Sequence, residues 1–167
     1  ANEKSSLLLH RRFRRAKLTG EATVLGSLTK FSVEHAALIN GVQGHVLDYD
    51  DAQLATSPSR PMGQQTHPTT PVLAAALALA ESRRATGAAL LTAYIVGLEV
   101  ACRLGDAVDP SHYLDGFHPT GTLGAFGATA ACAQLLKLPQ RSIRHALGIA
   151  GTLASGLRAN RGTMAKG

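Results

Sequence analysis

The stretch GAALLTAYIVGLEVACRLGDAV, residues 87–108, decides the fold. As a helix it is apolar on nearly all sides until Glu99 and Arg103, whose spacing of four residues predicts an ion pair within the helix. Residues 72–80 and 121–138 are also dominated by Ala, Leu and Gly. Because a helix that is apolar all round is buried, we expect a helical core and a large interface with another copy or with further sequence.

Composition favours an all-α protein with one domain. The chain has 167 residues, enough for a core, and it contains no Trp, 3 Tyr and 4 Phe. Aromatic residues favour strands, whereas the Ala and Leu that dominate here favour helices. Gly121, Gly124 and Gly127 do not form a phosphate-binding fingerprint and predict close helix packing. We expect helices near residues 33–47, 71–85, 87–108, 121–138 and 140–157.

The positive charge is concentrated at the N-terminus. The formal net charge is +6, and residues 1–17 hold six Lys or Arg and one Glu, so that segment carries +5. The nearly neutral remainder argues against a nucleic-acid surface. No uninterrupted apolar run reaches the roughly 18 residues of a membrane span. Two cysteines, Cys102 and Cys132, and no secretory signal favour a reducing, cytoplasmic compartment.

Residues 1–19 read as a basic leader that precedes a domain over residues 20–167. The run LLLHRRFRR at residues 7–15 could form an amphipathic helix, a targeting segment or an added terminal piece. We expect a solvated or disordered arm. Such an arm would contribute nothing to the core.

The densest polar chemistry lies in NGVQGHVLDYDD, residues 40–51. A helix that starts after Ser32 and runs toward Asp48 would place His45 and Asp48 on one face, with Asp50 pointing elsewhere. Asp50 and Asp51 are then turn or supporting residues. A loop over residues 52–66, rich in Pro and Ser, separates this stretch from His67.

The triplet His-Pro-Thr occurs twice, at residues 67–69 and 118–120, each time before a predicted helix. Backbone N–H groups at a helix start favour an anion, so either histidine could face an anionic ligand or be a loop residue satisfied by backbone. His45, Asp48, Asp50, Asp51 and His67 could alternatively hold Mg²⁺ or Mn²⁺.

Six motifs occur in an order that resembles the MmgE/PrpD family, which includes 2-methylcitrate dehydratase, cis-aconitate decarboxylase and iminodisuccinate epimerase. The resemblance covers about residues 20–167. The motifs are Asn40-Gly41, His45-x-x-Asp48-Tyr49-Asp50-Asp51, His67-Pro68-Thr69, Gly97-x-Glu99-Val100-x-x-Arg103, Gly116-Phe117-His118-x-Thr120 and Met164-x-Lys166.

The resemblance implies a helical domain followed by a smaller α+β domain, usually in a homodimer with the active site between the domains. Because the chain ends just after Lys166, we expect it to lack the second domain, which leaves activity of the isolated chain open. The implied catalytic residues are Asp48, His67, His118 and Lys166. The implied substrate-binding residues are His45, Thr69, Tyr113 and Thr120. We expect no metal and no cofactor.

The implied function is that of a cofactor-independent lyase acting on a small polycarboxylate, foremost by dehydrating a 2-methylcitrate-like substrate. A histidine suits proton removal beside a carboxylate, and Lys166 suits the charge that develops. Decarboxylation of a cis-aconitate-type substrate and epimerisation of an iminodisuccinate-type substrate are the alternatives within the family. A truncated helical module that only associates is the alternative without catalysis.

Overall fold

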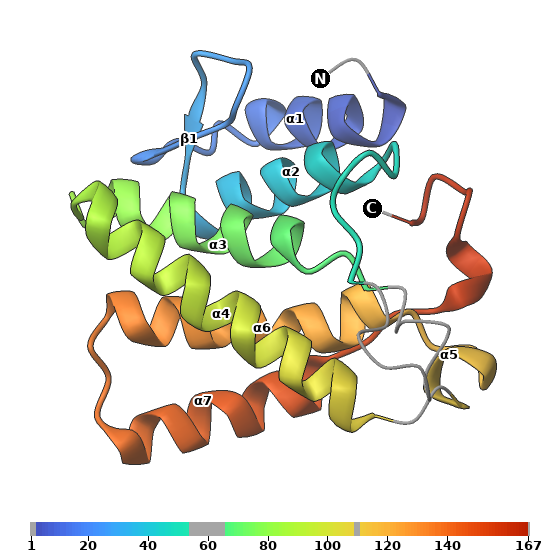
Figure 1. Ribbon diagram of the computed structural model, residues 1–167. Helices are drawn as coiled ribbons and strands as arrows, with labels where there is room; N and C mark the ends of the chain where they lie inside the picture. The colour runs from blue at the N-terminus through green and yellow to red at the C-terminus, as the bar shows by residue number, and fades with distance from the viewer. Residues whose placement is uncertain (1–2, 54–65, 109–110, 167) are drawn as a thin grey trace.

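A computed structural model describes residues 3–53, 66–108 and 111–166. Within these ranges the protein is helical apart from a two-stranded antiparallel hairpin, so the predicted all-α class is confirmed (Figure 1). The elements are α1 (Lys4–Arg15), β1 (Ala22–Thr23), β2 (Lys30–Phe31), α2 (Val33–His45), α3 (Thr69–Ser82), α4 (Gly87–Ala107), α5 (Ser111–Leu114), α6 (Pro119–Leu135), α7 (Gln140–Leu153) and the 3₁₀ turn η1 (Arg158–Asn160).

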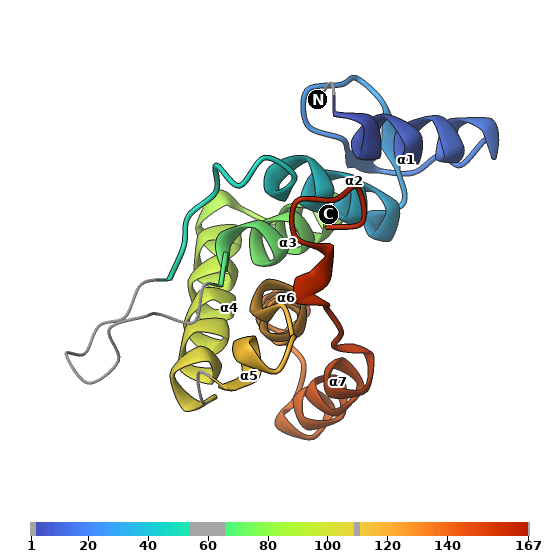
Figure 2. The same cartoon turned by 90° about the vertical axis from the view of Figure 1, so that its right-hand side faces the viewer.

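Helix α6 lies at the centre of the packing. It contacts α3, α4 and α7, while α2 packs between α1 and α3. Figure 2 shows α6 nearly end-on, with α4 alongside it and α7 beneath it. The C-terminal segment then runs past the start of α6 toward α2. Segments that are distant in sequence therefore meet where α2 ends and where α3 and α6 begin.

Helix α1 forms part of the core, so the expectation of a disordered leader is wrong for residues 4–15. Leu9 and Phe13 pack against a buried cluster that includes Phe31, and the rings of Phe13 and Phe31 are 6.0 Å apart. The arginines of α1 are exposed. The segment orders because its apolar positions cover the hairpin, while its charges stay in solvent.

Glycines set the distance between α4 and α6. A methyl group added at Gly97 would lie 2.6 Å from the carbonyl oxygen of Gly127, and one added at Gly127 would lie 2.8 Å from that of Gly97. Gly124 packs against Pro71 and Gly121 against the carbonyl of Ser155 in the same way. The prediction of close helix packing is confirmed for Gly124 and Gly127, whereas Gly121 packs against the segment that follows α7.

Helix α4 is long and apolar enough, by length and composition, to cross a membrane, which differs from the expectation that no run is long enough. The difference arises because the criterion of length and composition allows a few charged residues, such as Glu99 and Arg103, within the helix. The predicted ion pair between these two residues is present, with N and O 2.6 Å apart. Core helices of soluble proteins meet the same criterion. Here Leu91 and Ile95 remain 58% and 55% exposed, so an apolar outer face is left without a partner among the described residues.

The contact between α4 and α6 can be tested by Gly97→Ala. We expect this change to destabilise the protein by about 2–3 kcal/mol, because the methyl group meets a backbone carbonyl that cannot move independently. Urea unfolding measures the difference. Gly148→Ala is the matched control, since Gly148 is also inside a helix but a methyl there meets nothing within 4 Å. Equal unfolding midpoints for the two variants would contradict the account.

Candidate active site

The acidic turn after α2 does not continue the helix. Helix α2 ends at His45, and the Asp48 N–H donates a hydrogen bond to the His45 carbonyl, with N and O 3.1 Å apart. Asp48 adopts φ +55°, a left-handed conformation that Asp tolerates better than most residues. The expectation that His45 and Asp48 share a helix face is therefore wrong, although the turn still keeps the two residues together.

The long loop does not separate the acidic turn from His67. The Gln53 N–H donates to the Thr66 carbonyl at 2.8 Å, so the two ends of the loop are paired, while residues 54–65 lie outside the described residues. The backbone N–H of His67 donates to Thr120 Oγ1 at 3.0 Å. These bonds fix His67 beside both the acidic turn and the start of α6.

Asp50 is the centre of the cluster, and the expectation that it points elsewhere is wrong. Its side chain is only 7% exposed. Its Oδ2 lies 3.0 Å from His45 Nδ1 and accepts a hydrogen bond from Thr70 Oγ1 at 2.8 Å. Its Oδ1 lies 3.4 Å from His67 Nδ1. The carboxylate faces inward because the chain leaves helical geometry after His45.

The contact with Asp50 determines which ring nitrogen of His45 carries the proton. An ionised carboxylate only accepts hydrogen bonds, so His45 Nδ1 must carry the proton. In the neutral ring Nε2 is then a bare acceptor. That atom is buried and has no hydrogen-bond partner among the described residues. His45 is thus a buried imidazole with an unused basic nitrogen.

Lys166 is an integral part of the site and is not a solvated tail residue. Its ammonium group donates to the Asp48 carboxylate and, at 3.1 Å, to the His45 carbonyl, and its side chain is 4% exposed. The hydrogen bond from Lys166 is the main reason why the pKa of Asp48 is lowered. His67 Nε2 lies 3.6 Å from the same carboxylate. Asp48 therefore stays ionised between two cationic or hydrogen-bonding groups.

The segment that carries Lys166 is held beside α6. The His118 N–H donates to the Gly156 carbonyl at 3.0 Å, and Phe117 and Leu157 form an isolated antiparallel bridge. These backbone bonds fix the chain direction after α7. They bring a lysine to residues that lie about 120 positions earlier, as the Lys166–Asp48 pair shows.

His118 stands immediately before α6 and stacks on His45, with ring centroids 5.6 Å apart and planes 21° apart. The pKa of His118 is lowered to about 4, mainly by burial and in addition by the positive charge of the neighbouring His45, Lys166 and His67. Burial also lowers the pKa of His45, although the Asp50 charge opposes that effect. Both rings are consequently neutral bases near pH 7.

The remaining predicted residues divide into two groups. Thr120 belongs to the cluster through its bond to His67, and Tyr113 lines a small hollow together with Asp48, His67 and His118. The Thr69 hydroxyl instead bonds the Tyr94 hydroxyl at 2.7 Å. The structure therefore directs Thr69 toward α4 and does not bring it into the cluster.

Sequence reasoning missed Arg161, which lines the same small hollow. Its Nη1 donates to the Tyr113 hydroxyl at 3.1 Å, and Arg158 Nη1 donates to the Tyr113 carbonyl at 2.8 Å. A guanidinium group suits a carboxylate because it can donate two parallel hydrogen bonds. The only sequence signal was the spacing of two arginines in the loop after α7.

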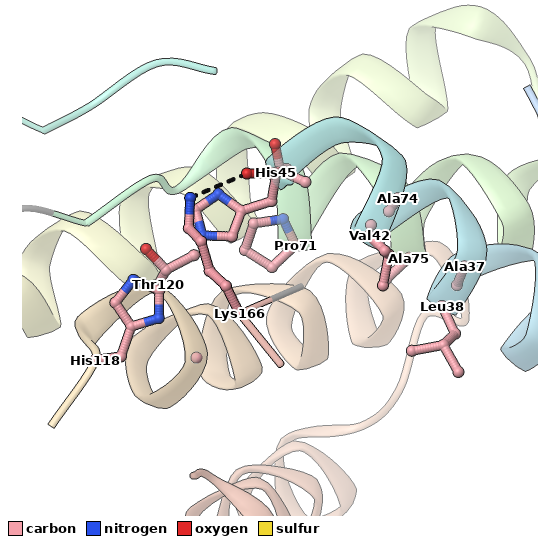
Figure 3. A pocket seen from close by; sticks show the side chains of 13 residues that line it. Ala37, Leu38, Val42, His45, Pro71, Ala74, Ala75, His118, Thr120 and Lys166 are labelled. Atoms are coloured by element: carbon pink, nitrogen blue, oxygen red, sulfur yellow. Dashed lines mark hydrogen bonds between the residues drawn. The ribbon is translucent and has the colours of Figure 1, made fainter. Parts of the chain in front are cut away.

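A pocket of about 280 Å³ opens beside the cluster, between α2, α3 and the start of α6. Figure 3 shows His118, Thr120 and the Lys166 side chain at one end of this pocket. His45 also lines it. A small anion could reach the imidazoles and the lysine from this side.

His45, Asp48, Asp50 and His67 could together hold a cation, since one ligand atom from each lies within 4.8 Å of the others. However, Asp48 already binds the Lys166 ammonium, and Asp50 already accepts from Thr70 and faces a protonated His45 Nδ1. A cation would have to displace that lysine. The donor set therefore fits a metal ion poorly, and the expectation of no metal remains a prediction.

The role of Asp50 can be tested by Asp50→Asn. We expect a loss of about 1–3 kcal/mol in stability, because the buried network loses its negative charge and one of its two acceptor oxygens. The pKa of His45 should fall further, because the Asp50 charge is what opposes the effect of burial. NMR titration of the histidine rings and urea unfolding measure the two effects.

Asp51→Asn is the matched control for that change. Asp51 Oδ1 accepts one hydrogen bond from the Thr69 N–H at 3.3 Å, which an amide oxygen can also accept. The Asp51→Asn substitution should therefore change the free energy of unfolding and the pKa of His45 only slightly. If Asp51→Asn and Asp50→Asn had equal effects, the central position of Asp50 would be refuted.

Comparison with known proteins identifies a matching family and several related proteins. The model of the MmgE/PrpD N-terminal domain matches residues 2–167, a range that includes α1. Human cis-aconitate decarboxylase is 36% identical over 137 residues, which cover 79% of this chain and 27% of that protein. Mouse cis-aconitate decarboxylase is 34% identical over 137 residues, which cover 79% of this chain and 26% of that protein.

The cis-aconitate decarboxylase-like protein oryM of Aspergillus oryzae is 30% identical over 148 residues, which cover 84% of this chain and 29% of that protein. The chain thus spans little more than a quarter of the length of these relatives. The family match extends over nearly the whole chain. On this evidence the protein belongs to the MmgE/PrpD family and carries the family's N-terminal domain.

Proposed function

We propose that the protein acts as a cofactor-independent lyase on a small polycarboxylate. The observation that carries this proposal is that a half-buried, neutral His118 and the Lys166 side chain line the same pocket. A neutral imidazole can take a proton, and an ammonium group stabilises the negative charge that results. Three relatives named as cis-aconitate decarboxylases or as decarboxylase-like support the same class of reaction.

Substrate carboxylates would bind at the positively charged side of the site. The Lys166 ammonium, the Arg161 guanidinium and the N-terminus of α6 provide this charge. Asp48 accepts a hydrogen bond from Lys166 and offsets part of this charge, so a substrate carboxylate would also need Arg161 and the N-terminus of α6. The substrate is therefore oriented with its carboxylates toward the C-terminal segment and its reacting carbon toward the imidazoles.

For decarboxylation, the bond between carbon and one carboxylate breaks, CO₂ leaves, and a proton is added to the carbon that keeps the electron pair. His67, which lies between the Asp48 and Asp50 carboxylates, is our candidate for the acid. Lys166 is our candidate for holding the developing negative charge. The names of the relatives favour this reaction over the other family chemistries.

Dehydration of a 2-methylcitrate-like substrate is the second candidate. His118 would remove a proton beside a carboxylate, His67 would protonate the leaving hydroxyl group, and a C=C bond and water would form. The observation that favours this reaction is that the site provides a neutral base, His118, and beside it a histidine, His67, that faces two carboxylates.

We also propose that the protein works as a homo-oligomer. The exposed apolar residues on α4, Leu91 and Ile95, and on α7, Ile149 and Leu153, supply surface that a second copy could bury. A cytoplasmic location remains a prediction from the cysteine content. The molar mass of the full-length protein, measured by light scattering, tests this proposal. A monomer would contradict it.

The proposed function is tested by His118→Ala in the full-length protein, with cis-aconitate and 2-methylcitrate as substrates. We expect kcat to fall at least about 100-fold, the usual contribution of a positioned acid or base. His145→Ala is the control, because His145 is an exposed residue of α7. CO₂ release and the absorbance of unsaturated product distinguish the two reactions. Wild-type rates in the His118 variant would contradict the assignment.

The same site makes a prediction about pH. Because the pKa of His118 is lowered to about 4, its neutral form predominates above that value and is lost below it. We therefore expect the contribution of His118 to kcat/KM to stay constant from pH 7 to about pH 5 and to fall as the pH approaches 4. A decline centred near pH 6.5, the ordinary histidine value, would show that the pKa of His118 is not lowered.

A further inference from the structure

We propose that helix α1 docks the protein reversibly on a membrane surface that contains anionic lipids. The inference concerns the basic segment at the N-terminus, whose charge the proposed reaction does not use. Among the described residues, the two pockets that His118 lines include no residue of α1. The inference therefore stands apart from the proposed function. The contact lies at the surface of the bilayer and does not cross it.

The inner face of α1 fixes the direction of its outer face. Ser6 is buried, and Leu9 and Phe13 pack against the core cluster that contains Phe31. Because these three positions lie on one side of the helix, the opposite side faces away from the protein. Figures 1 and 2 both show α1 at the outer edge of the molecule, remote from α6 and α7. Packing of the inner face thus holds the outer face toward solvent.

The outer face of α1 carries a row of cations. Positions 4, 8, 11 and 15 follow one another at helical spacing and share this face. The exposed cations in and beside the row are Lys4, Arg11, Arg12, Arg14, Arg15 and Lys17. No ion pair between described residues includes any of them. A charged row about 18 Å long is therefore free to bind an anionic surface.

Exposed leucines distinguish a lipid surface from other anionic partners. Leu8 lies between Lys4 and Arg11 on the outer face and is 54% exposed. The turn of the hairpin on which α1 packs adds Leu25, which is exposed, and Leu28, which is fully exposed. At a bilayer surface, leucine side chains can enter the boundary between headgroups and acyl chains while cations stay with the phosphates. Cations and leucines exposed in one region therefore fit a lipid surface.

Nucleic acid fits this face less well. Proteins that bind single strands without sequence preference stack the bases on exposed aromatic rings. The one aromatic residue of α1, Phe13, packs inward. Proteins that read a duplex use Asn or Gln as well as Arg at the base edges, and residues 4–15 contain neither Asn nor Gln. Leu8 in the middle of the row would gain nothing from phosphates.

The test measures how the full-length protein partitions onto lipid vesicles that are collected by sedimentation. The vesicles consist of phosphatidylcholine, with or without phosphatidylserine at about one lipid in three. We expect binding only to the vesicles that contain phosphatidylserine. Binding should disappear as the salt concentration approaches about 1 M, where the screening length falls to about 3 Å. No binding to these vesicles at about 0.1 M salt would overturn the inference.

The variants avoid the part of α1 that approaches the active site, since Lys4 and Lys166 line a common hollow. Arg11 and Arg15 do not line it. Arg11→Gln combined with Arg15→Gln should weaken partitioning by about fivefold for each cation, and so by about 25-fold. Gln has nearly the helix propensity of Arg, so α1 should stay folded and the melting temperature should not change.

Arg141→Gln combined with Arg144→Gln is the matched control. Both arginines are exposed on α7, and the pair changes the net charge by the same amount. This control should weaken partitioning by less than about twofold, because charges beyond the screening length contribute little. Leu8→Gln should weaken partitioning by at least about threefold, the value of one buried methylene.

The outcomes separate the explanations. A large loss with the α1 pair and a small loss with the α7 pair would support docking through α1, whereas equal losses would overturn it. Duplex DNA or single-stranded RNA bound more tightly than the vesicles, with no effect of Leu8→Gln, would overturn it in favour of nucleic acid. If the α1 pair lowers the melting temperature, Arg11→Lys with Arg15→Lys decides. That variant keeps both charges and must keep vesicle binding.

Discussion

The buried carboxylate of Asp50 is the interaction on which the site depends. A carboxylate that is 7% exposed is stable only with hydrogen-bond donors around it. Its donors come from the last residue of α2, His45, and from the first turn of α3, Thr70. His67 Nδ1 also faces it. The requirement to satisfy one charge therefore fixes how the two helices meet and how two imidazoles are oriented.

That arrangement has a direct chemical consequence. Histidines packed against one another and against a lysine cannot all be protonated, because burial and like charge both disfavour the charged forms. Asp50 offsets this in part for His45, whereas burial dominates at His118 and lowers its pKa to about 4. The site thus places neutral imidazoles next to a lysine, which suits acid–base chemistry on a carboxylic acid substrate.

The helical fold could be predicted from residues 87–108 and from the Ala- and Leu-rich runs, because periodic apolar patterns are local. The inward direction of Asp50 could not be predicted, since it depends on a positive φ at Asp48 that no pattern marks. Helix α1 was missed for a related reason. Its apolar residues, Leu9 and Phe13, are covered only because the hairpin places Phe31 and its neighbours against them.

The site could be predicted only in part from the residues themselves. The two His-Pro-Thr triplets indicated His67 and His118 through their position before helices, which is a local property. Lys166 came from the family resemblance alone, because a lysine in a glycine-containing tail carries no local signal. Arg161 was missed and Thr69 was misplaced, since the hydroxyl of Thr69 turns to Tyr94 of a helix that begins eighteen residues later.

The most direct test of the central claim is the protonation state of His118 in the full-length protein. Ring ¹⁵N chemical shifts, followed from pH 8 to pH 4, report that state for each histidine. The account predicts a neutral His118 ring at pH 7 that gains a proton only as the pH approaches about 4. A His118 ring that is protonated at pH 7 would contradict it, because His118 could then not take a proton from the substrate.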